Sequence, residues 1–473
     1  MLNLRVIMCG SSLWRNFWTI IIVLVFVQVL SSLFYITQIG NIDNAYTGKG
    51  PPGDVQYKVK RKHKSDTNIH AEDKFKLTFM LDGYTFDHHG RGVHMEGEIT
   101  SSEIHSFSPM VEQEAYNKFI DPLNEHTIYA NSPAITWHRG EIVSVLRIWL
   151  MNERFDRDKR PANYFMDNML YTQRFDSSFG PKENGSILGI MATKIWSIGD
   201  GPIEPRIFRL KSHLYVSFNA AMMIKENNNI VPLDTTLLWD YEKKVLILPK
   251  VPRDRGLKNA LKNPMTRDKH WVPFDLGGHL YFLYTLDPLR VLYCQLDGTC
   301  GFVHYEGDKD HKFHDIKDHI RGGTPLEVYK WPYYISISHG TFIQKPSKKR
   351  YYTAHLMVFT TFPKHRIVYI SNSIEVHPLI LYRSEIVRNK FIEHSFIFPV
   401  GLIIENPDTI SIGVHVNDNI SIVVRLRGIE SLMKRIMVED SKASPASGPP
   451  VGTLDEYIIE AVSNKTGLEF LHE

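Results

Sequence analysis

The feature of this sequence that most constrains its fold is an internal repeat. Five segments share one layout: a small or polar residue, a proline, an apolar strand, a polar turn, and a second apolar strand rich in aromatic and β-branched residues. The prolines are Pro133, Pro205, Pro273, Pro325 and Pro399. The second strands are expected to begin at Glu141, His213, His279, Tyr333 and Thr409. Strands at this density, joined by hairpins, predict an all-β fold, namely a five-bladed β-propeller whose first strands line a central channel.

A hydrophobic stretch near the N-terminus predicts a membrane anchor. Residues 16–37 carry no charge and are long enough for a helix to cross the ~30 Å of bilayer hydrocarbon. Arg5 and Arg15 precede the stretch and no Lys or Arg follows it until Lys49, so the positive-inside rule places residues 1–15 in the cytosol. A cleaved signal peptide is the alternative, but the stretch is long for one and lacks a small-x-small cleavage site. We therefore expect a single-pass type II membrane protein of the Golgi or endoplasmic reticulum with a lumenal body.

The remaining chain divides by composition into a stem, a body and a C-terminal segment. Residues 38–75 are rich in Gly, Pro, Lys and Asp, which is typical of a flexible stem. The repeat places the propeller catalytic domain at 76–440, and a linker with a C-terminal helix follows at 441–473. Short flanking helices are expected at 110–120, 429–438 and 454–462. The last of these opens with a capping box, Thr453-Leu-Asp-Glu456.

Several features agree with a lumenal body. Glycosylation sequons begin at Asn184, Asn419 and Asn464. Of the three cysteines, Cys294 and Cys300 flank the hairpin signal Asp297-Gly298, so their thiols are expected to face each other and form a disulfide in an oxidising lumen. Two free buried thiols are the alternative, while a zinc site is disfavoured because no further cysteine supplies ligands.

Composition excludes several classes of protein. The 55 Lys and Arg residues against 52 Asp and Glu residues give a net charge of +3, and 43% of the residues are hydrophobic. This balance excludes a disordered chain, a collagen and a protein that coats nucleic acid. The aromatic content of 12% favours β-structure and surfaces that pack against sugar rings.

The later repeats carry motifs that resemble those of a known family. Residues 202–210 read Pro-Ile-Glu-Pro-Arg-Ile-Phe-Arg-Leu. Further motifs are RGGTPL at 321–326, SHGTF at 338–342, HLMVF at 355–359, HRIVYIS at 365–371 and GLIIENPDTISIGVHVND at 401–418. Over about residues 125–430 the chain resembles five-bladed β-propeller glycosyltransferases related to β-mannosyltransferases and β-mannoside phosphorylases, with Ile203-Glu204 in place of their Glu-Asp. The resemblance implies mannosyl transfer, with GDP-mannose as the donor.

Candidate functional residues lie where the motifs should converge at one mouth of the channel. Transfer of a sugar to a hydroxyl needs a carboxylate that takes a proton and donors that hold a phosphate leaving group. Glu204 is the expected catalytic carboxylate, with Asp200 and Asp418 as the other candidates. Expected substrate contacts are Arg206, Arg321, Gly322, Gly323, His339 and His415. The structural alternative is that Glu204 and Arg206 form an ion pair and that the histidines are ordinary hydrogen-bonding residues.

Metal binding is not expected to be part of the mechanism. Asp156-Arg-Asp158 and Asp308-Lys-Asp310 spell the Asp-x-Asp pattern that holds a divalent ion in other glycosyltransferase folds, but neither follows a buried strand. The cluster at 87–89 with His94 and Glu96 lacks the fixed spacing of a zinc site. A divalent ion therefore remains an alternative, and no permanently bound cofactor is expected.

Three classes of function fit these observations. The first is a secretory-pathway glycosyltransferase that moves a sugar from a nucleotide-sugar to a glycan acceptor. The second is a glycosidase or glycoside phosphorylase on the same scaffold, and the third is a non-catalytic carbohydrate-binding propeller. The expected partners are the glycan acceptor and the membrane, through residues 16–37, and not nucleic acid.

Overall fold

The structure is a computed structural model of the 473-residue chain, and all the residues it describes belong to the compact unit His70–Glu473. The described residues are 74–86, 92–118, 126–152, 167–190, 201–226, 229–251, 266–306, 319–384, 392–442 and 453–471. The predicted cytosolic tail and membrane anchor lie outside them. Within these ranges no helix is both long enough and apolar enough to span a bilayer.

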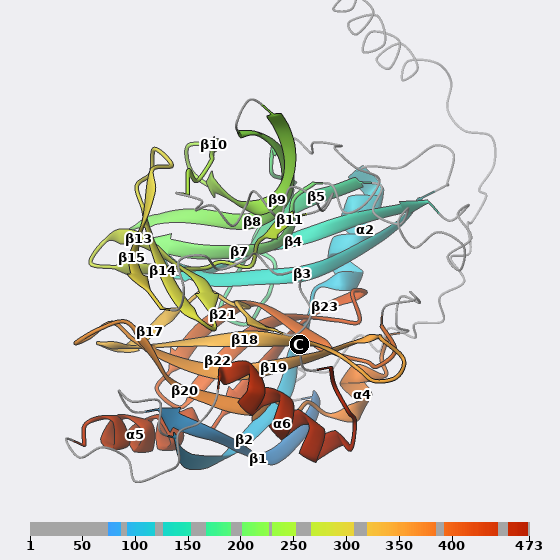
Figure 1. The fold of residues 1–473 in the computed structure, drawn as a ribbon. Helices are drawn as coiled ribbons and strands as arrows, with labels where there is room; N and C mark the ends of the chain where they lie inside the picture. Colours follow the sequence, from blue (N-terminus) through green and yellow to red (C-terminus); the bar gives the residue numbers. More distant parts are fainter. Residues whose placement is uncertain are drawn as a thin grey trace, which may run out of the picture. The chain divides into compact units, whose positions relative to one another are not determined.

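Three small antiparallel-rich sheets hold the first three repeats (Figure 1). The first contains β3 (His126–His138), β4 (Glu141–Asn152), β5 (Asp167–Phe175) and β6 (Ser186–Ile187). The second contains β7 (Ile203–Leu210), β8 (His213–Glu226), β9 (Asn229–Asp240), β10 (Val245–Ile247) and β11 (Thr266–Asp268). The third contains β12 (Val272–Leu276), β13 (His279–Leu286), β14 (Leu289–Cys294) and β15 (Cys300–Tyr305).

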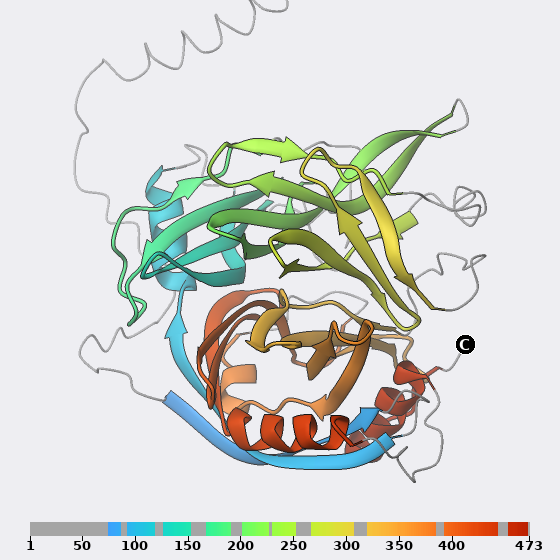
Figure 2. The same ribbon diagram turned by 90° about the vertical axis from the view of Figure 1, so that its left-hand side faces the viewer.

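The last two repeats share a single ten-stranded sheet, which curls into an open half-barrel (Figure 2). Its strands are β1 (Lys74–Phe86), β2 (Gly92–Ser106), β16 (His319–Arg321), β17 (Glu327–Lys330), β18 (Tyr333–Ile343), β19 (Arg350–Thr360), β20 (Arg366–Ser373), β21 (Ile397–Asn406), β22 (Thr409–Val416) and β23 (Ile420–Arg427).

The repeat is confirmed at the level of its strands. The five second strands, β4, β8, β13, β18 and β22, begin at the predicted residues. The antiparallel register shifts at Asn131/Ala134, Ile203/Arg206 and Pro399/Gly401, so a bulge accompanies the motif proline in three repeats. Proline has no N–H to give to the ladder, and a bulge accommodates that loss. Two residues that precede a motif proline, Ser132 and Glu204, have the left-handed φ values of 52° and 51°.

Five separate blades are not observed, and the prediction of a closed five-bladed propeller is not confirmed. The described strands form four hydrogen-bonded sheets, because the hairpin of β1 and β2 joins the last two repeats. β1 pairs with β20 and β2 pairs with β23. The fourth and fifth repeats, which were expected to form separate blades, are therefore parts of one sheet. The sequence analysis assigned no strand to this hairpin.

The first strands of successive repeats lie next to one another. β3 contacts β7, β7 contacts β12, and β17 contacts β21. Leu326 N donates a hydrogen bond to Pro273 O at 3.1 Å, which links the third and fourth repeats. The last repeat packs against the first, because a Cβ on Gly413 would lie 1.9 Å from Pro133 O. The starts of the five motifs are therefore drawn toward one region.

The hydrophobic core is divided among these sheets. The largest cluster fills the inside of the ten-stranded sheet and includes Leu432 and Ile436 of α5 (Ile429–Asp440). A second cluster joins the third sheet to α6 (Leu454–Thr466) through Ile458 and Val462. Two further helices are α2 (Ser108–Lys118) and α4 (Pro378–Leu381). α2, α5 and α6 confirm the three predicted flanking helices, and the capping box of Thr453 with Glu456 is formed.

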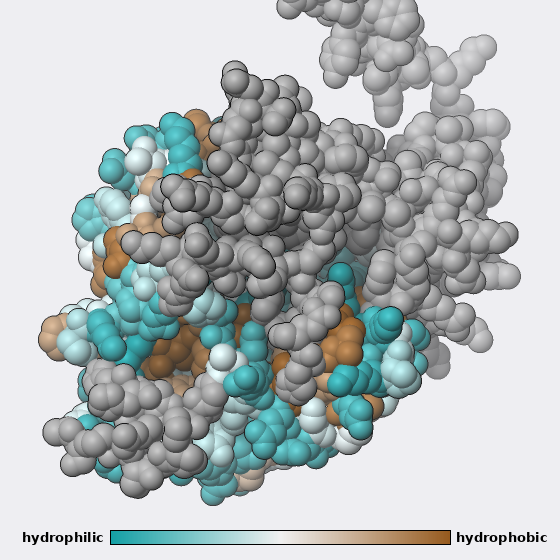
Figure 3. Space-filling view, viewed as in Figure 1, coloured by the Kyte–Doolittle hydropathy of each residue, from teal (hydrophilic) through white to brown (hydrophobic). Residues whose placement is uncertain are grey.

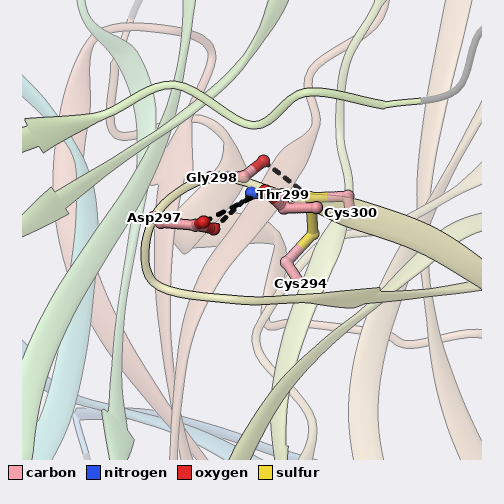
Figure 4. The surroundings of a disulfide bond; sticks show 5 residues. All are labelled: Cys294, Asp297, Gly298, Thr299 and Cys300. Atoms are coloured by element: carbon pink, nitrogen blue, oxygen red, sulfur yellow. Dashed lines mark hydrogen bonds between the residues drawn. A yellow bond between two sulfur atoms is a disulfide. The ribbon is translucent and has the colours of Figure 1, made fainter.

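The two predicted partner cysteines are joined in a disulfide (Figure 4). Cys294 ends β14 and Cys300 begins β15, and the two residues are directly opposite each other in the antiparallel register. Gly298 has a φ of 89°, which the tight turn requires, and the Asp297 carboxylate accepts a 2.7 Å hydrogen bond from Thr299 N. The turn chemistry therefore places the two thiols together.

Candidate functional site

The centre of the candidate site is a contact between Glu204 and His270. Glu204 lies in the bulge at the start of β7, and His270 lies two residues before β12, so two successive repeats contribute one residue each. His270 Nδ1 is 2.8 Å from Glu204 Oε2. Both residues have left-handed backbones, with φ values of 51° and 73°. Such conformations are costly for residues with a Cβ and are concentrated at functional sites.

Asn219 on β8 fixes the orientation of the Glu204 carboxylate. Its Nδ2 donates a 2.7 Å hydrogen bond to Glu204 Oε2. Its Oδ1 accepts from Thr236 Oγ1 at 3.1 Å and from His270 N at 3.3 Å. The same amide therefore holds the carboxylate and the backbone of the histidine that faces it.

Lys269 adds a positive charge on the other side of the carboxylate. Its Nζ is 3.7 Å from Glu204 Oε1 and 3.7 Å from Asp234 Oδ2, and its side chain is 9% exposed. This nearly buried ammonium favours the ionised form of the Glu204 carboxylate.

The electrostatics of the pair favour an ionised carboxylate beside a neutral imidazole. Burial by itself would raise the pKa of Glu204, but the contacts with His270 and Lys269 hold that pKa well below its usual value. Burial lowers the pKa of His270 to about 3, against the opposing attraction of Glu204. His270 Nδ1 faces the carboxylate, and in the neutral tautomer that carries its proton on Nδ1 the other ring nitrogen, Nε2, is a proton acceptor. A carboxylate beside one ring nitrogen fixes the orientation and the tautomer of a histidine that acts as a base.

A row of buried rings connects this pair to the last repeat. The ring centroids of His270 and His339 are 5.0 Å apart, those of His339 and Phe398 are 4.3 Å apart, and those of Phe398 and His415 are 5.0 Å apart. His415 Nδ1 then lies 3.4 Å from Asp418 Oδ1. Burial lowers the pKa values of both His339 and His415, so these two imidazoles are also neutral.

His339 presents an unpaired polar atom in this row. The residue is 1% exposed, and its Nδ1 has no hydrogen-bond partner among the residues that the structure describes. Buried polar groups normally have a partner, and one without a partner at a functional site is a candidate ligand contact.

Positive side chains surround the two carboxylates of the site. Arg147 on β4 acts electrostatically on both Asp418 and Glu204, and its Nε donates a 2.6 Å hydrogen bond to Asn168 Oδ1. Burial lowers the pKa of Arg147 to about 10, so it stays charged at neutral pH. Arg321 at the end of β16 contributes to the low pKa values of His270 and His339. Together with Lys269 these groups make the site attractive to an anion.

Arg206 is held by backbone oxygens of the chain, and its predicted contact with substrate stays a prediction. The residue is fully buried, and its Nε donates to the carbonyl of Gly323. Its two terminal nitrogens donate to Gly322 O and Glu204 O, each at 3.1 Å. The guanidinium therefore ties the bulge of β7 to the chain that follows β16.

Gly322 and Gly323 lie against the protein's own backbone, and their predicted contact with substrate stays a prediction. A Cβ on Gly322 would lie 2.4 Å from His270 O, and a Cβ on Gly323 would lie 2.1 Å from Ile337 O. These glycines allow a close approach, as expected, but the approaching group is the protein's own backbone. Their carbonyls hold Arg206, so the pair is part of the frame of the site.

The other predicted residues fall into three groups. Asp418, 33% exposed, is placed at the site by Asn131, whose Nδ2 donates to Asp418 O at 3.1 Å. Asp200 lies outside the described residues, as do both Asp-x-Asp pairs and residues 87–89. Asn184 and Asn464 are exposed and Asn419 is partly buried. The described residues contain no cluster of three or more acidic, His or Cys side chains arranged to hold a metal ion.

Sequence reasoning missed several residues of this site. His270 and Lys269 immediately precede the third motif, where the alignment of the repeat places them near Glu204 of the second. Their position just before the third motif was therefore the sequence signal that could have identified them. Phe398 directly precedes the motif proline Pro399, as Glu204 precedes Pro205, and that shared position was a further signal. Asn219 and Arg147 lie within strands and carry no local signal, because only the packing of the sheets brings them to Glu204.

Sequence comparison relates part of the chain to two enzymes of one organism. No family model matches the chain. The β-mannosyltransferase 1 of Komagataella phaffii is 26% identical over 160 residues, which are 31% of this chain and 22% of that protein. The β-mannosyltransferase 3 of the same organism is 31% identical over 134 residues, which are 27% of this chain and 20% of that protein. The chain thus matches about a fifth of the length of these carbohydrate-active relatives.

Solved structures give a weak likeness over most of the chain. A β-1,2-mannobiose phosphorylase from Listeria innocua is 11% identical with a TM-score of 0.43, covering 67% of this chain and 95% of the other. A GDP-Man-dependent mannosyltransferase from Leishmania mexicana is 10% identical with a TM-score of 0.36, covering 67% of this chain and 93% of the other.

Proposed function

We propose that the chain is a glycosyltransferase that moves a hexosyl group, with mannose as the leading candidate, from a nucleotide-sugar to a glycan hydroxyl. The observation that carries this proposal is the Glu204–His270 contact of 2.8 Å in a site that Lys269, Arg321 and Arg147 make electropositive. The partial similarity to β-mannosyltransferases supports the same class of reaction. GDP-mannose is the proposed donor. The five repeats are proposed to correspond to the blades of a propeller, with the last two joined in one sheet.

In the proposed reaction His270 is the base. Its Nε2 accepts the proton of the acceptor hydroxyl while the hydroxyl oxygen forms a bond to the anomeric carbon of the donor sugar. The bond from that carbon to the phosphate oxygen breaks, and the diphosphate leaves with the electron pair. Glu204 stabilises the imidazolium that forms, and Arg321 and Lys269 stabilise the charge of the leaving group.

The direct test is incubation of the purified full chain with individual nucleotide-sugars and a panel of mannose-containing acceptors. A transferase releases the nucleoside diphosphate and lengthens an acceptor with one of the donors. Cleavage or phosphorolysis of a mannobiose without any use of nucleotide-sugars would favour the glycosidase or phosphorylase alternative. Binding of glycans with no chemistry would leave the carbohydrate-binding alternative.

We also propose a lumenal, type II orientation anchored through residues 16–37 in the Golgi or endoplasmic reticulum. Expressed full-length chain is expected to shift to higher mobility after endoglycosidase treatment, because the sequons at Asn184 and Asn464 are exposed. Replacing both asparagines with glutamine should remove most of that shift. If the chain migrates on a gel at the mass of the unglycosylated polypeptide before endoglycosidase treatment, the lumenal orientation is contradicted.

The proposed base predicts different pH dependences for two kinetic constants. Because burial lowers the pKa of free His270 to about 3, kcat/KM for the donor should stay level as the pH falls from 7 to 5. A bound diphosphate adds negative charge, which raises the pKa of His270, so kcat should begin to fall at a higher pH than kcat/KM. Initial rates measured from pH 4.5 to 8, with circular dichroism as a check on folding, test this. Loss of half of kcat/KM near the ordinary histidine pKa of about 6.5 would exclude His270 as the buried base.

A further inference from the structure

Tyr382, directly after α4, is an exposed aromatic residue on a well-anchored segment. It exposes 77% of its surface, and Leu379 on the same short helix exposes 54%. Elsewhere on the described surface the large exposed hydrophobic residues are spread over several elements. On the face shown in Figure 3, hydrophobic side chains gather in separate patches. Hydrogen bonds and an ion pair hold the segment that carries Tyr382 in place.

The anchors of this segment come from both sides of Tyr382. Before it, His377 Nδ1 accepts a 3.2 Å hydrogen bond from Leu379 N, and the His377 ring stacks on Phe75 with centroids 5.7 Å apart. After it, Arg383 forms an ion pair with the buried Glu103, and its guanidinium lies 5.8 Å from the centroid of Phe75. The backbone that presents Tyr382 is therefore fixed before any ligand arrives.

Asn417 connects the segment to the candidate site. Its Nδ2 donates hydrogen bonds to Leu381 O at 3.1 Å and to Ser384 O at 3.0 Å. Its Oδ1 accepts from Phe396 N at 2.9 Å. Asn417 immediately precedes Asp418, and both residues have left-handed φ values, 56° and 55°. One buried side chain thus holds the Tyr382 segment against the residues that form the last-repeat side of the site.

We propose that Tyr382 is the platform on which a sugar ring of the acceptor glycan stacks. The proposal rests on the proposed transferase function and identifies where its second substrate binds. An exposed aromatic face on a fixed backbone suits the apolar face of a pyranose, because little conformational entropy is lost when the ligand binds. The acceptor is favoured over the donor because the charged diphosphate is drawn to the buried cations of the site, whereas Tyr382 is exposed.

A second exposed aromatic provides a matched control at the other end of the strands. Trp331 is 64% exposed and lies between the end of β17 at Lys330 and the start of β18 at Tyr333. The site residues, in contrast, lie where the first strands begin. If any exposed aromatic ring could bind the glycan, Trp331→Ala and Tyr382→Ala would weaken binding equally. If Tyr382 is the acceptor platform, only Tyr382→Ala weakens binding.

The test measures binding and turnover with the full chain. β-1,2-mannobiose is the probe, and its binding is followed by saturation-transfer NMR. Tyr382→Ala is expected to weaken mannobiose binding about tenfold and to raise the acceptor KM by a similar factor, with the donor KM unchanged. Tyr382→Phe keeps the ring and should retain binding, and Trp331→Ala should behave like the wild type. Circular dichroism confirms that each variant is folded.

The outcomes separate this inference from the proposed function. If transfer occurs and Tyr382→Ala leaves the acceptor KM unchanged, the platform is overturned and the transferase stands. If mannobiose binding depends on Tyr382 but no nucleotide-sugar is used, the platform stands and the transferase proposal falls. If wild-type protein does not bind mannobiose, or if Trp331→Ala weakens binding as much as Tyr382→Ala, the platform is overturned.

Discussion

Glu204→Gln is expected to lower the turnover of sugar transfer by a factor on the order of 10² or more while the chain stays folded, with a lower free energy of unfolding because Lys269 loses one of its two carboxylate partners. The amide oxygen can replace Oε2 and keep both of its contacts, with Asn219 at 2.7 Å and with His270 at 2.8 Å. The fold and the shape of the site are therefore retained. The variant lacks the negative charge that stabilises the imidazolium when His270 accepts a proton.

The measurement is single-turnover transfer together with donor affinity. Donor binding should change little, because Arg321 and Arg147 are untouched. A suitable control is Glu375→Gln, which removes a carboxylate that pairs with Lys465 and is 38% exposed. This control should keep wild-type turnover and wild-type thermal stability, because exposed ion pairs contribute little to either.

Wild-type turnover in Glu204→Gln would mean that the carboxylate only supports the local structure. Asp418, which already lies 3.4 Å from His415, would then become the leading carboxylate, with Asp200 as the remaining candidate. An intermediate result, with a higher donor KM and the same turnover, would also contradict the base proposal, because it would assign Glu204 to substrate binding alone.

Most of the local structure of this chain could be predicted from the sequence. Turn residues and apolar alternation act over a few neighbours, and for this reason the starts of the five second strands, the capping box at Thr453 and the hairpin between Cys294 and Cys300 were predictable. The pairing of the β1–β2 hairpin with β20 and β23 was not, because these partners are about three hundred residues away. No local pattern encodes a partner at that distance, and this pairing turns two expected blades into one sheet.

The site shows the same limit at the level of single residues. The motif around Pro205 pointed to Glu204, and the structure gives that residue a charged and polar environment. The partner, His270, comes from the next repeat, and the arrangement depends on the bulge that rotates Glu204 out of the regular ladder. Arg206 was assigned to ligand binding because its chemistry suits phosphate, but the carbonyls that occupy it belong to residues more than a hundred positions later.

Those carbonyls make Arg206 the residue whose loss should affect the fold most. Its guanidinium is buried and donates hydrogen bonds to three backbone oxygens, those of Glu204, Gly322 and Gly323. None of these three bonds is to the Glu204 carboxylate. The connection it makes joins β7 to the segment that carries Arg321. Removal of the side chain leaves buried acceptors without donors and opens a cavity between two repeats.

Arg206→Ala is therefore expected to lower the free energy of unfolding by roughly 3–5 kcal/mol, the scale for removing one partner of a buried charged contact. Thermal unfolding followed by circular dichroism would record the loss, and a low yield of soluble protein would accompany it. Arg174→Ala is the matched control, since Arg174 lies on β5, is 45% exposed and pairs at 3.5 Å with Glu183, which is 57% exposed. It should cost less than about 1 kcal/mol. Arg206→Ala protein with wild-type stability and a raised donor KM would reverse the assignment, because only a ligand contact behaves in that way.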